Sequence, residues 1–179
     1  AVTLTDRTDI KAVTSSHEQS HSGRAMILSF YNYEECCGYY TGMISNLRQN
    51  KLHGIVNIAK PVLLLAVMQL VDEGWLRNNR IILTSELEDR YTGLYNRYEP
   101  DKAATPVCYP FYHLHSDGFW HIRWIGGEKP PEISTSRKFI ADHIDHICLD
   151  DDLWILLLHP DFRLRLMDFI INRKLDPDR

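Results

Sequence analysis

The stretch KPVLLLAVMQLVDEG, residues 60–74, decides the fold. Proline is favoured at the first position of a helix, so Lys60 and Pro61 indicate where a helix begins. The residues that follow are apolar on nearly every face, which is typical of a helix at the centre of a domain. Gly74 suits the end of that helix. We therefore predict that a central helix runs from Lys60 to Val71 and that the rest of the chain packs around it.

Caps and apolar periodicity predict five more helices around this centre. Ser85 and Glu88 have the spacing of a capping box, and Pro100 closes the helix that they begin. Three successive aspartates at residues 150–152 suit a helix start, where carboxylates cap the backbone and complement the helix dipole. The predicted helices run from Tyr33 to Arg48, from Ser85 through Tyr95, from Ser136 through Ile147, from Asp150 through Leu157 and from Pro160 through Ile170.

One segment favours a strand. Residues 118–125, Gly-Phe-Trp-His-Ile-Arg-Trp-Ile, are rich in aromatic and β-branched residues, and Gly126-Gly127 marks a turn after them. Residues 106–115 before them are rich in proline and aromatic residues and indicate a turn region. The expected fold class is mainly α (α+β), a compact helical domain with one short β-hairpin or wing.

Length and composition indicate a soluble globular protein. The chain has 179 residues, of which 44% are hydrophobic and 25% are charged. The longest apolar run, residues 61–68, is far shorter than the ~20 residues that cross a bilayer. Four cysteines without a Cys-x-x-Cys pair favour a reducing compartment, so we expect a cytoplasmic protein without membrane contact. We divide the chain into an N-terminal arm and helix of uncertain role, residues 1–47, and a main domain, residues 48–179.

Charge is unevenly distributed along the chain. The formal net charge is -4, but residues 48–140 carry 12 Lys and Arg against 10 Asp and Glu. An excess of +2 does not by itself predict DNA binding. It does indicate the part of the chain where an anionic partner would sit.

The histidines and carboxylates raise the alternative of a metal-dependent nuclease or hydrolase. His113, His115 and His121 could converge on zinc around a turn, and His143 and His146 with Asp142 and Asp145 form a second candidate group. A solvated polar helix face explains the second group more simply. The chain has no phosphate-binding glycine loop, no Gly-x-Ser-x-Gly and no HExxH motif. We expect no catalytic residues, no metal and no cofactor.

The segment Tyr109-Pro110-Phe111-Tyr112-His113-Leu114 places a proline ring and aromatic edges beside polar groups, and Ser116-Asp117-Gly118-Phe119-Trp120 follows it closely. Such a segment could line a shallow apolar pocket at the surface. We expect Phe111, Leu114 and Trp120 to pack in the core. Tyr109, Pro110 and His113 could then point outward from the same turn.

These residues resemble a known family. The central helix string of residues 60–67, Arg77-Asn78-Asn79-Arg80-Ile81, the segment of residues 109–120 and Leu149-Asp150-Asp151-Asp152-Leu153-Trp154 through Pro160 look like the sulfur-binding domain of modification-dependent HNH restriction endonucleases, which are type IV restriction enzymes. The similarity spans about residues 50–175. It implies a domain, residues 48–179, that binds double-stranded DNA carrying phosphorothioate linkages.

The resemblance also implies site residues. It assigns the sulfur pocket to Tyr109, Pro110 and His113, and phosphate contacts to Lys60 and Arg137. Residues beside these are further candidates for phosphate or base contacts, namely His53, Asn57, Ala59, Ser136 and Lys138. Family members often carry a histidine where this chain has Ala59, and a small residue where it has His113. A nuclease would lie on another domain or on a partner subunit, within a bacterial defence system of the restriction-modification type.

A third hypothesis comes from the aromatic segment between Phe30 and Ile44. Its tyrosines could form a base-stacking platform, or the segment could meet a partner protein, but we favour packing of this segment inside the domain.

Overall fold

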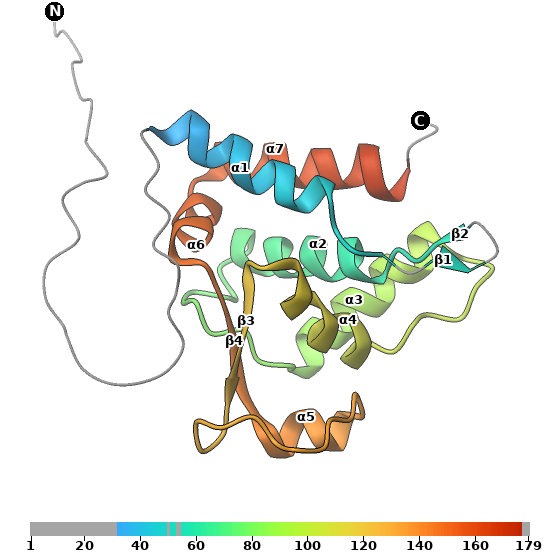
Figure 1. The fold of residues 1–179 in the computed structure, drawn as a ribbon. Coiled ribbons are helices and arrows are strands. Elements are labelled where there is room, and N and C mark those ends of the chain that lie inside the picture. The colour runs from blue at the N-terminus through green and yellow to red at the C-terminus, as the bar shows by residue number, and fades with distance from the viewer. Residues whose placement is uncertain (1–31, 50, 53–54, 177–179) are drawn as a thin grey trace, which may run out of the picture.

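The computed structural model describes residues 32–49, 51–52 and 55–176. The expected arm of residues 1–24 and the candidate His53 lie outside the described residues. The described chain is mainly helical, which confirms the predicted fold class (Figure 1). Within it, no helix is both long and apolar enough to cross a membrane. The elements are α1 (Tyr33–Ser45), β1 (Lys51–Leu52), β2 (Ile55–Val56), α2 (Ala59–Asp72), α3 (Ser85–Tyr98), α4 (Cys108–His113), β3 (Trp120–Trp124), α5 (Arg137–His143), β4 (Ile144–Leu149), α6 (Asp151–Leu158) and α7 (Pro160–Ile170), with a 3-10 turn at Leu114–Asp117 and a π-helical turn at Ile171–Leu175.

The central helix forms where the sequence predicts it. α2 begins at Ala59, one residue before Lys60, and ends at Asp72. Leu63, Leu65 and Ala66 are fully buried, because α3, α4, α6 and α7 all pack against this helix. α2 is thus the scaffold on which the other elements are placed.

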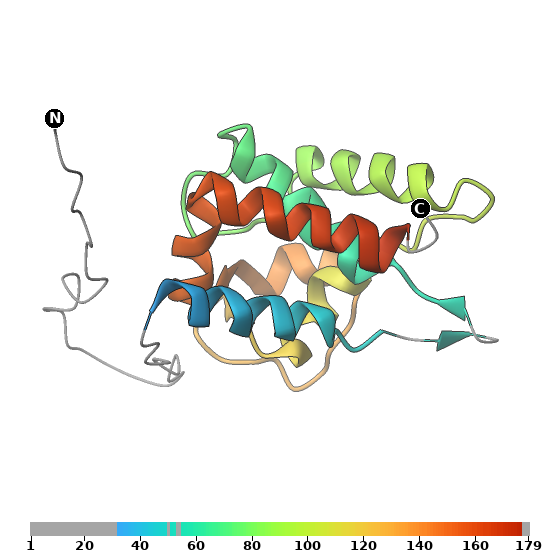
Figure 2. The same ribbon diagram turned by 90° about the horizontal axis from the view of Figure 1, so that it is seen from above.

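α1 and α7 lie side by side above α2, as the two views in Figures 1 and 2 show. α1 packs against α6 and α7. Tyr40 and Ile44 of α1 are buried in the same hydrophobic core as α2, so they are not available to a partner protein. The division between residues 1–47 and 48–179 stays a prediction.

The capping box predicted at Ser85 and Glu88 is not observed, because the helix begins one residue earlier and Leu87 takes the third helical position. Thr84 is the N-cap of α3, and its hydroxyl accepts a hydrogen bond from the Leu87 backbone N–H at 3.3 Å. Serine and threonine both favour the N-cap position, so adjacent Thr84 and Ser85 are both candidates from the sequence. The rest of α3 follows the prediction, with Leu87, Tyr91 and Tyr95 buried.

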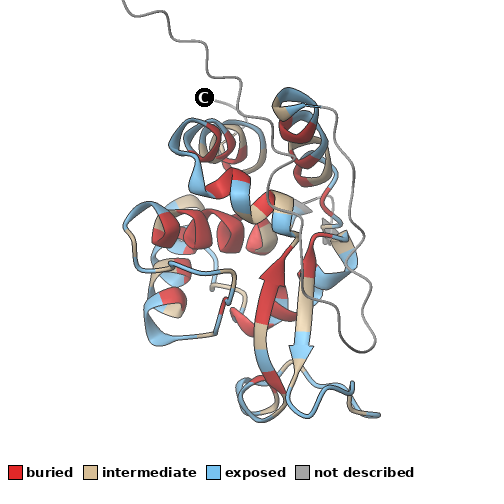
Figure 3. Cartoon of the chain, turned by 90° about the vertical axis from the view of Figure 1, so that its left-hand side faces the viewer, coloured by how far each residue is buried: buried red, intermediate tan, exposed pale blue. Residues whose placement is uncertain are grey.

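The β element differs from the prediction in its second strand. The helix predicted from Ser136 through Ile147 ends at His143, and β4 then pairs antiparallel with β3. Ile147 is fully buried, and it also exchanges two backbone hydrogen bonds of 2.8 Å with Ile81. Isoleucine suits a strand as well as an apolar helix face, so its spacing alone was ambiguous. Figure 3 shows the hairpin extending from the buried interior to an exposed end that carries α5.

The proline- and aromatic-rich segment is helical rather than an irregular turn. α4 and the 3-10 turn after it carry the chain to Gly118, whose φ of 94° suits glycine. Phe111 and Trp120 are buried as predicted, and the Trp120 indole N–H donates to the Phe111 carbonyl oxygen at 2.9 Å. This bond fixes α4 against the start of β3.

Asp150 does not cap α6 with its side chain, although it occupies the N-cap position as expected. Its carboxylate accepts a hydrogen bond from the Tyr40 hydroxyl at 3.0 Å and lies 2.5 Å from His121 Nε2. The side chain therefore joins α1, β3 and α6 instead of serving its own helix.

Candidate nucleic-acid interface

A pocket of about 290 Å³ opens where the first residues of α2 meet one face of α4. It brings together segments that are distant in sequence. Six of the predicted site residues line it, including Ala59, which the resemblance singled out as a departure. The lining is Arg48, Gln49, Asn57, Ala59, Lys60, Thr105, Tyr109, Pro110, His113 and Ser116.

The apolar part of the pocket comes from α4. Pro110 is buried, whereas Tyr109 is 48% exposed and His113 is exposed. Pro110 is tolerated in the first turn of this short helix because backbone N–H groups there have no partner within the helix. Tyr109 and His113 are one helical turn apart, and their rings stack with centroids 6.2 Å apart and planes inclined by 24°. The result is a wall of ring surface beside a proline.

The polar part of the pocket is built on Lys60. Its ammonium lies 2.6 Å from Asp117 Oδ2 and 3.5 Å from the Ser116 hydroxyl. The other Asp117 oxygen accepts a hydrogen bond from the Arg48 backbone N–H at 2.8 Å. Asp117 is almost fully buried, so it holds both the lysine side chain and the chain at Arg48 in fixed positions.

The Asn57 side chain forms hydrogen bonds within the protein. Its side-chain oxygen accepts from the Ala59 backbone N–H at 2.8 Å, and its amide group donates to the Thr105 hydroxyl at 3.1 Å. The first bond satisfies an orphan donor at the start of α2. Thr105 is held in turn by the hydroxyls of Tyr91 and Tyr95. Asn57 thus shapes the pocket and positions α2, rather than presenting a free amide.

The pKa of His113 lies below its ordinary value of 6.5, because the pocket wall removes part of the ring from water, which disfavours the charged form, and because His115 and Lys60 lie nearby. The lowered pKa favours the neutral imidazole at pH 7. It adds a polarisable ring to the pocket and no positive charge.

The candidates on α5 lie outside this pocket. Ser136 caps α5 by accepting from the Phe139 backbone N–H at 3.1 Å. Arg137 pairs with Glu88, and Lys138 pairs with Asp142. Burial raises the pKa of Cys108, and the nearby charge of Arg137 partly opposes this rise. Because Cys108 is the first residue of α4, Arg137 lies near the beginning of the helix that carries the pocket wall.

The alternative of a histidine metal centre is not supported by the geometry. His115 bonds to the Tyr112 carbonyl oxygen, and His121 pairs with Asp150. His143 bonds to the Phe139 carbonyl oxygen, and His146 pairs with Asp145. Within residues 32–49, 51–52 and 55–176, no three His, Cys, Asp or Glu side chains gather as metal ligands.

Four pocket residues were not among the predicted ones, namely Arg48, Gln49, Thr105 and Ser116. Ser116 belongs to the quoted segment, Arg48 ends a predicted helix and Gln49 follows it, but no local motif marks any of the three as a site residue. Thr105 depends entirely on long-range packing, so local sequence could not reveal it.

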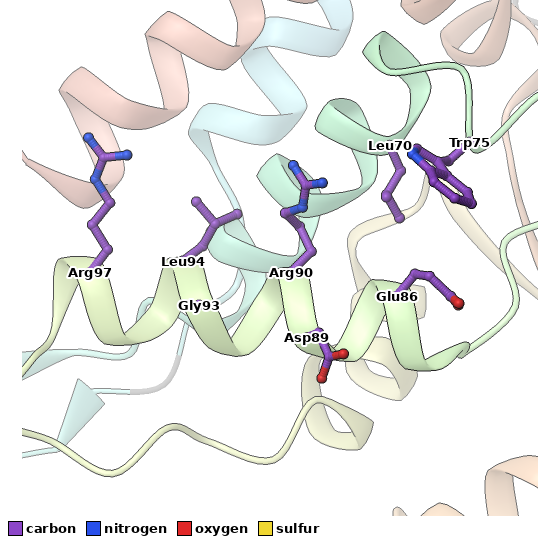
Figure 4. Close-up of a pocket in the computed structure, with 8 residues that line it drawn as sticks. All are labelled: Leu70, Trp75, Glu86, Asp89, Arg90, Gly93, Leu94 and Arg97. Atoms are coloured by element: carbon purple, nitrogen blue, oxygen red, sulfur yellow. The ribbon is translucent and has the colours of Figure 1, made fainter.

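A larger hollow of about 540 Å³ lies elsewhere, between α2 and α3 (Figure 4). Its lining mixes charges of both signs, and Arg90 there is held by Glu73 at 2.5 Å. Figure 4 shows Arg90 and Arg97 pointing to the same side of α3, with Trp75 near the end of α2. None of the predicted site residues lies in this hollow.

Comparison with known families adds one match. Residues 40–178 match the family described as ScoMcrA-like, DNA sulfur-binding domain. A search of curated proteins gives no match. The matched range begins within α1 and contains the whole pocket. The chain therefore belongs to the ScoMcrA-like DNA sulfur-binding domain family.

Proposed function

We propose that this chain binds double-stranded phosphorothioate DNA and that the sulfur atom enters the pocket between α2 and α4. The observation that carries the proposal is the gathering of Tyr109, Pro110 and His113 with Lys60 in one pocket of a DNA sulfur-binding family member. In the proposed complex, phosphate contacts supply affinity and the pocket supplies discrimination.

The pocket suits sulfur because of what surrounds it. In a phosphorothioate, sulfur replaces one non-bridging oxygen and is larger, more polarisable and less strongly hydrated. Against Pro110 and the ring faces of Tyr109 and neutral His113, an ordinary phosphate oxygen would lose its water without a replacement. Such a loss costs about 1–3 kcal/mol, whereas sulfur loses less. Modification is read as a difference in desolvation.

Lys60 has the remaining capacity to hold the phosphorothioate group. An ammonium carries three donors, and Asp117 and Ser116 occupy two of them within the described chain. The third can donate to the oxygen that sulfur has not replaced. Ala59 and Lys60 are also the first residues of α2, so the positive end of a buried helix faces the pocket.

The Lys60–Asp117 ion pair also affects discrimination between phosphorothioate and ordinary DNA. Because Asp117 compensates the lysine charge, the pocket attracts an ordinary phosphate less strongly than a free lysine would. Preference for the modified duplex then depends on the apolar wall rather than on net charge.

The remaining predicted contacts belong to the edge of the interface. We assign phosphate contacts to Arg137 and Lys138 on α5, which is carried by the exposed end of the hairpin. Both cations are paired with exposed or half-exposed carboxylates, and such pairs are weak, so DNA phosphates can replace the partners. Ser136 keeps α5 in place as its cap. DNA cleavage would come from a nuclease domain or subunit that this recognition domain recruits.

A titration with matched duplexes tests the proposal. Three duplexes of one sequence would carry the Rp phosphorothioate, the Sp phosphorothioate or an ordinary phosphate at one position. Binding would be measured by fluorescence anisotropy at one salt concentration, in several sequence contexts. We expect one phosphorothioate duplex to bind about tenfold to hundredfold more tightly than the ordinary duplex, in line with a difference of about 1.4–2.8 kcal/mol.

Equal dissociation constants for all three duplexes in every context would overturn the proposal. Absence of binding to any duplex would overturn it as well. A preference for the ordinary duplex would show that the pocket treats sulfur as an obstruction.

A further inference from the structure

A second hollow of about 410 Å³ adjoins the proposed sulfur pocket. It lies at the end of α1, between that helix and the 3-10 turn after α4. Arg48 and Ser116 line both hollows, so the two are continuous at these residues. The other lining residues are Tyr39, Gly42, Met43, Asn46 and Asp117.

Arg48 differs from the other cations around the site. Lys60, Arg137 and Lys138 all pair with carboxylates. The Arg48 side chain is exposed, and its guanidinium makes no ion pair or hydrogen bond with any part of the chain that the structure describes. Asp117 holds its backbone N–H, so the backbone of Arg48 is fixed while its guanidinium has no partner among the described residues.

The negative groups near Arg48 are already compensated. The Asp117 carboxylate is bound by Lys60 and by the Arg48 backbone. At the C-terminal end of α1, the Asn46 side chain donates to the Gly42 carbonyl oxygen at 2.9 Å, and the Lys174 ammonium donates to that of Ser45. An anion beside Arg48 would therefore meet few unpaired acceptors.

We propose that the DNA strand continues from the sulfur pocket into this second hollow, and that Arg48 binds an ordinary phosphate adjacent to the phosphorothioate. This inference rests on the proposed function. A guanidinium suits the role because it can donate two parallel hydrogen bonds to one phosphate. Tyr39, which is 37% exposed and packs edge-on against Tyr40 at 5.1 Å, forms the far wall for the intervening sugar.

The proposal separates affinity from discrimination. Because the phosphate beside Arg48 is unmodified, its contact is the same in ordinary and phosphorothioate DNA. Loss of the contact weakens both complexes by the same factor. The logarithm of the binding constant falls with the logarithm of salt concentration by about 0.9 for each phosphate contact. Arg48 therefore accounts for about 0.9 of the slope.

The test compares Arg48→Gln and Arg48→Lys with the wild-type chain and with Arg97→Gln as a matched control. Arg97 is an exposed arginine of α3 that lines the separate hollow in Figure 4. Binding to ordinary and phosphorothioate duplexes would be measured over a series of salt concentrations. We expect Arg48→Gln to reduce the salt slope by about 0.9 on both duplexes with an unchanged preference for sulfur. Arg48→Lys should keep the slope, and Arg97→Gln should match the wild type.

An unchanged slope in Arg48→Gln would overturn the phosphate contact. A fall in sulfur preference would also overturn the proposal, since Arg48 would then act at the phosphorothioate itself. If the wild type binds both duplexes equally, the proposed function fails, while the slope on ordinary DNA still decides the role of Arg48. A wild type that binds no DNA overturns both. Thermal unfolding of each variant checks that the fold is intact, as expected for a side chain that makes no hydrogen bond or ion pair with the described residues.

Discussion

Pro110 serves both the fold and the site. It is buried in the first turn of α4, where its missing backbone N–H costs no hydrogen bond within the helix. The same ring lines the pocket together with Tyr109 and Lys60. A local motif could therefore predict the pocket wall from sequence, because a single turn of α4 supplies Tyr109, Pro110 and His113 together.

Tyr109 tests whether ring surface or the hydroxyl group reads the sulfur. Tyr109→Phe keeps the ring that stacks on His113, so we expect it to keep the preference for phosphorothioate DNA. Tyr109→Ala removes the ring and should reduce the preference about tenfold, which corresponds to about 1.4 kcal/mol. Paired titrations of both variants against modified and ordinary duplexes measure this. Equal losses in Phe and Ala variants would contradict the desolvation account.

His113 gives a pH dependence of stability. Burial, followed by the charges of His115 and Lys60, holds the pKa of His113 below 6.5 in the folded chain. The unfolded chain therefore binds the proton at higher pH than the folded chain. Stability from this residue is complete above pH 6.5 and is lost as the pH falls through the lowered pKa.

The comparison with His113→Gln isolates that contribution. We expect urea unfolding between pH 7.5 and pH 5 to show a steeper loss of stability in the wild type than in His113→Gln. Parallel curves for the two proteins would show that the surroundings of His113 do not disfavour its protonated form.

At the scale of elements, the sequence predicted α2 but did not predict β4. α2 is apolar on all sides and needs no partner to be recognised, whereas Ile144 and Ile147 fit either a helix face or a strand. Pairing with β3 and with Ile81 decides between them, and both partners are distant in sequence. Arg48 and Thr105 were missed for the same reason, since tertiary packing brings them to the pocket.

The joint between α2, α6 and α7 depends on Arg163. This residue is only 7% exposed. Its guanidinium donates hydrogen bonds to the Asp72 carboxylate at 2.6 Å and to the Leu157 carbonyl oxygen at 2.6 Å. Asp72→Ala would leave a buried guanidinium without its counter-charge and should lower the free energy of unfolding by about 3 kcal/mol. Arg163→Met leaves Asp72 partly solvated and should cost less, about 1–2 kcal/mol.

Chemical denaturation of the two variants measures which of them loses more free energy of unfolding. If Arg163→Met were the more destabilising change, the lost guanidinium hydrogen bonds, including the one to the Leu157 carbonyl oxygen, would outweigh the cost of an unpaired charge, contrary to this account.

At the scale of the whole molecule, α1 shares the core with α2. Ile44 is 2% exposed and belongs to the same hydrophobic cluster. Ile44→Ala should therefore lower the free energy of the main unfolding transition by about 2–5 kcal/mol. Denaturation followed by both circular dichroism and tryptophan fluorescence measures it. A main transition that does not move, with a separate early loss of helix, would show that α1 unfolds independently.

The central claim is that sulfur is read in the pocket between α2 and α4, and a thermodynamic cycle tests it most directly. The cycle combines the wild type and Pro110→Ala with the phosphorothioate and ordinary duplexes, and Trp75→Ala in the separate hollow provides the control. We predict that Pro110→Ala weakens binding to the phosphorothioate duplex about tenfold more than binding to the ordinary duplex, while Trp75→Ala affects both equally. Equal weakening of the two duplexes by Pro110→Ala, at unchanged fold stability, would contradict the account.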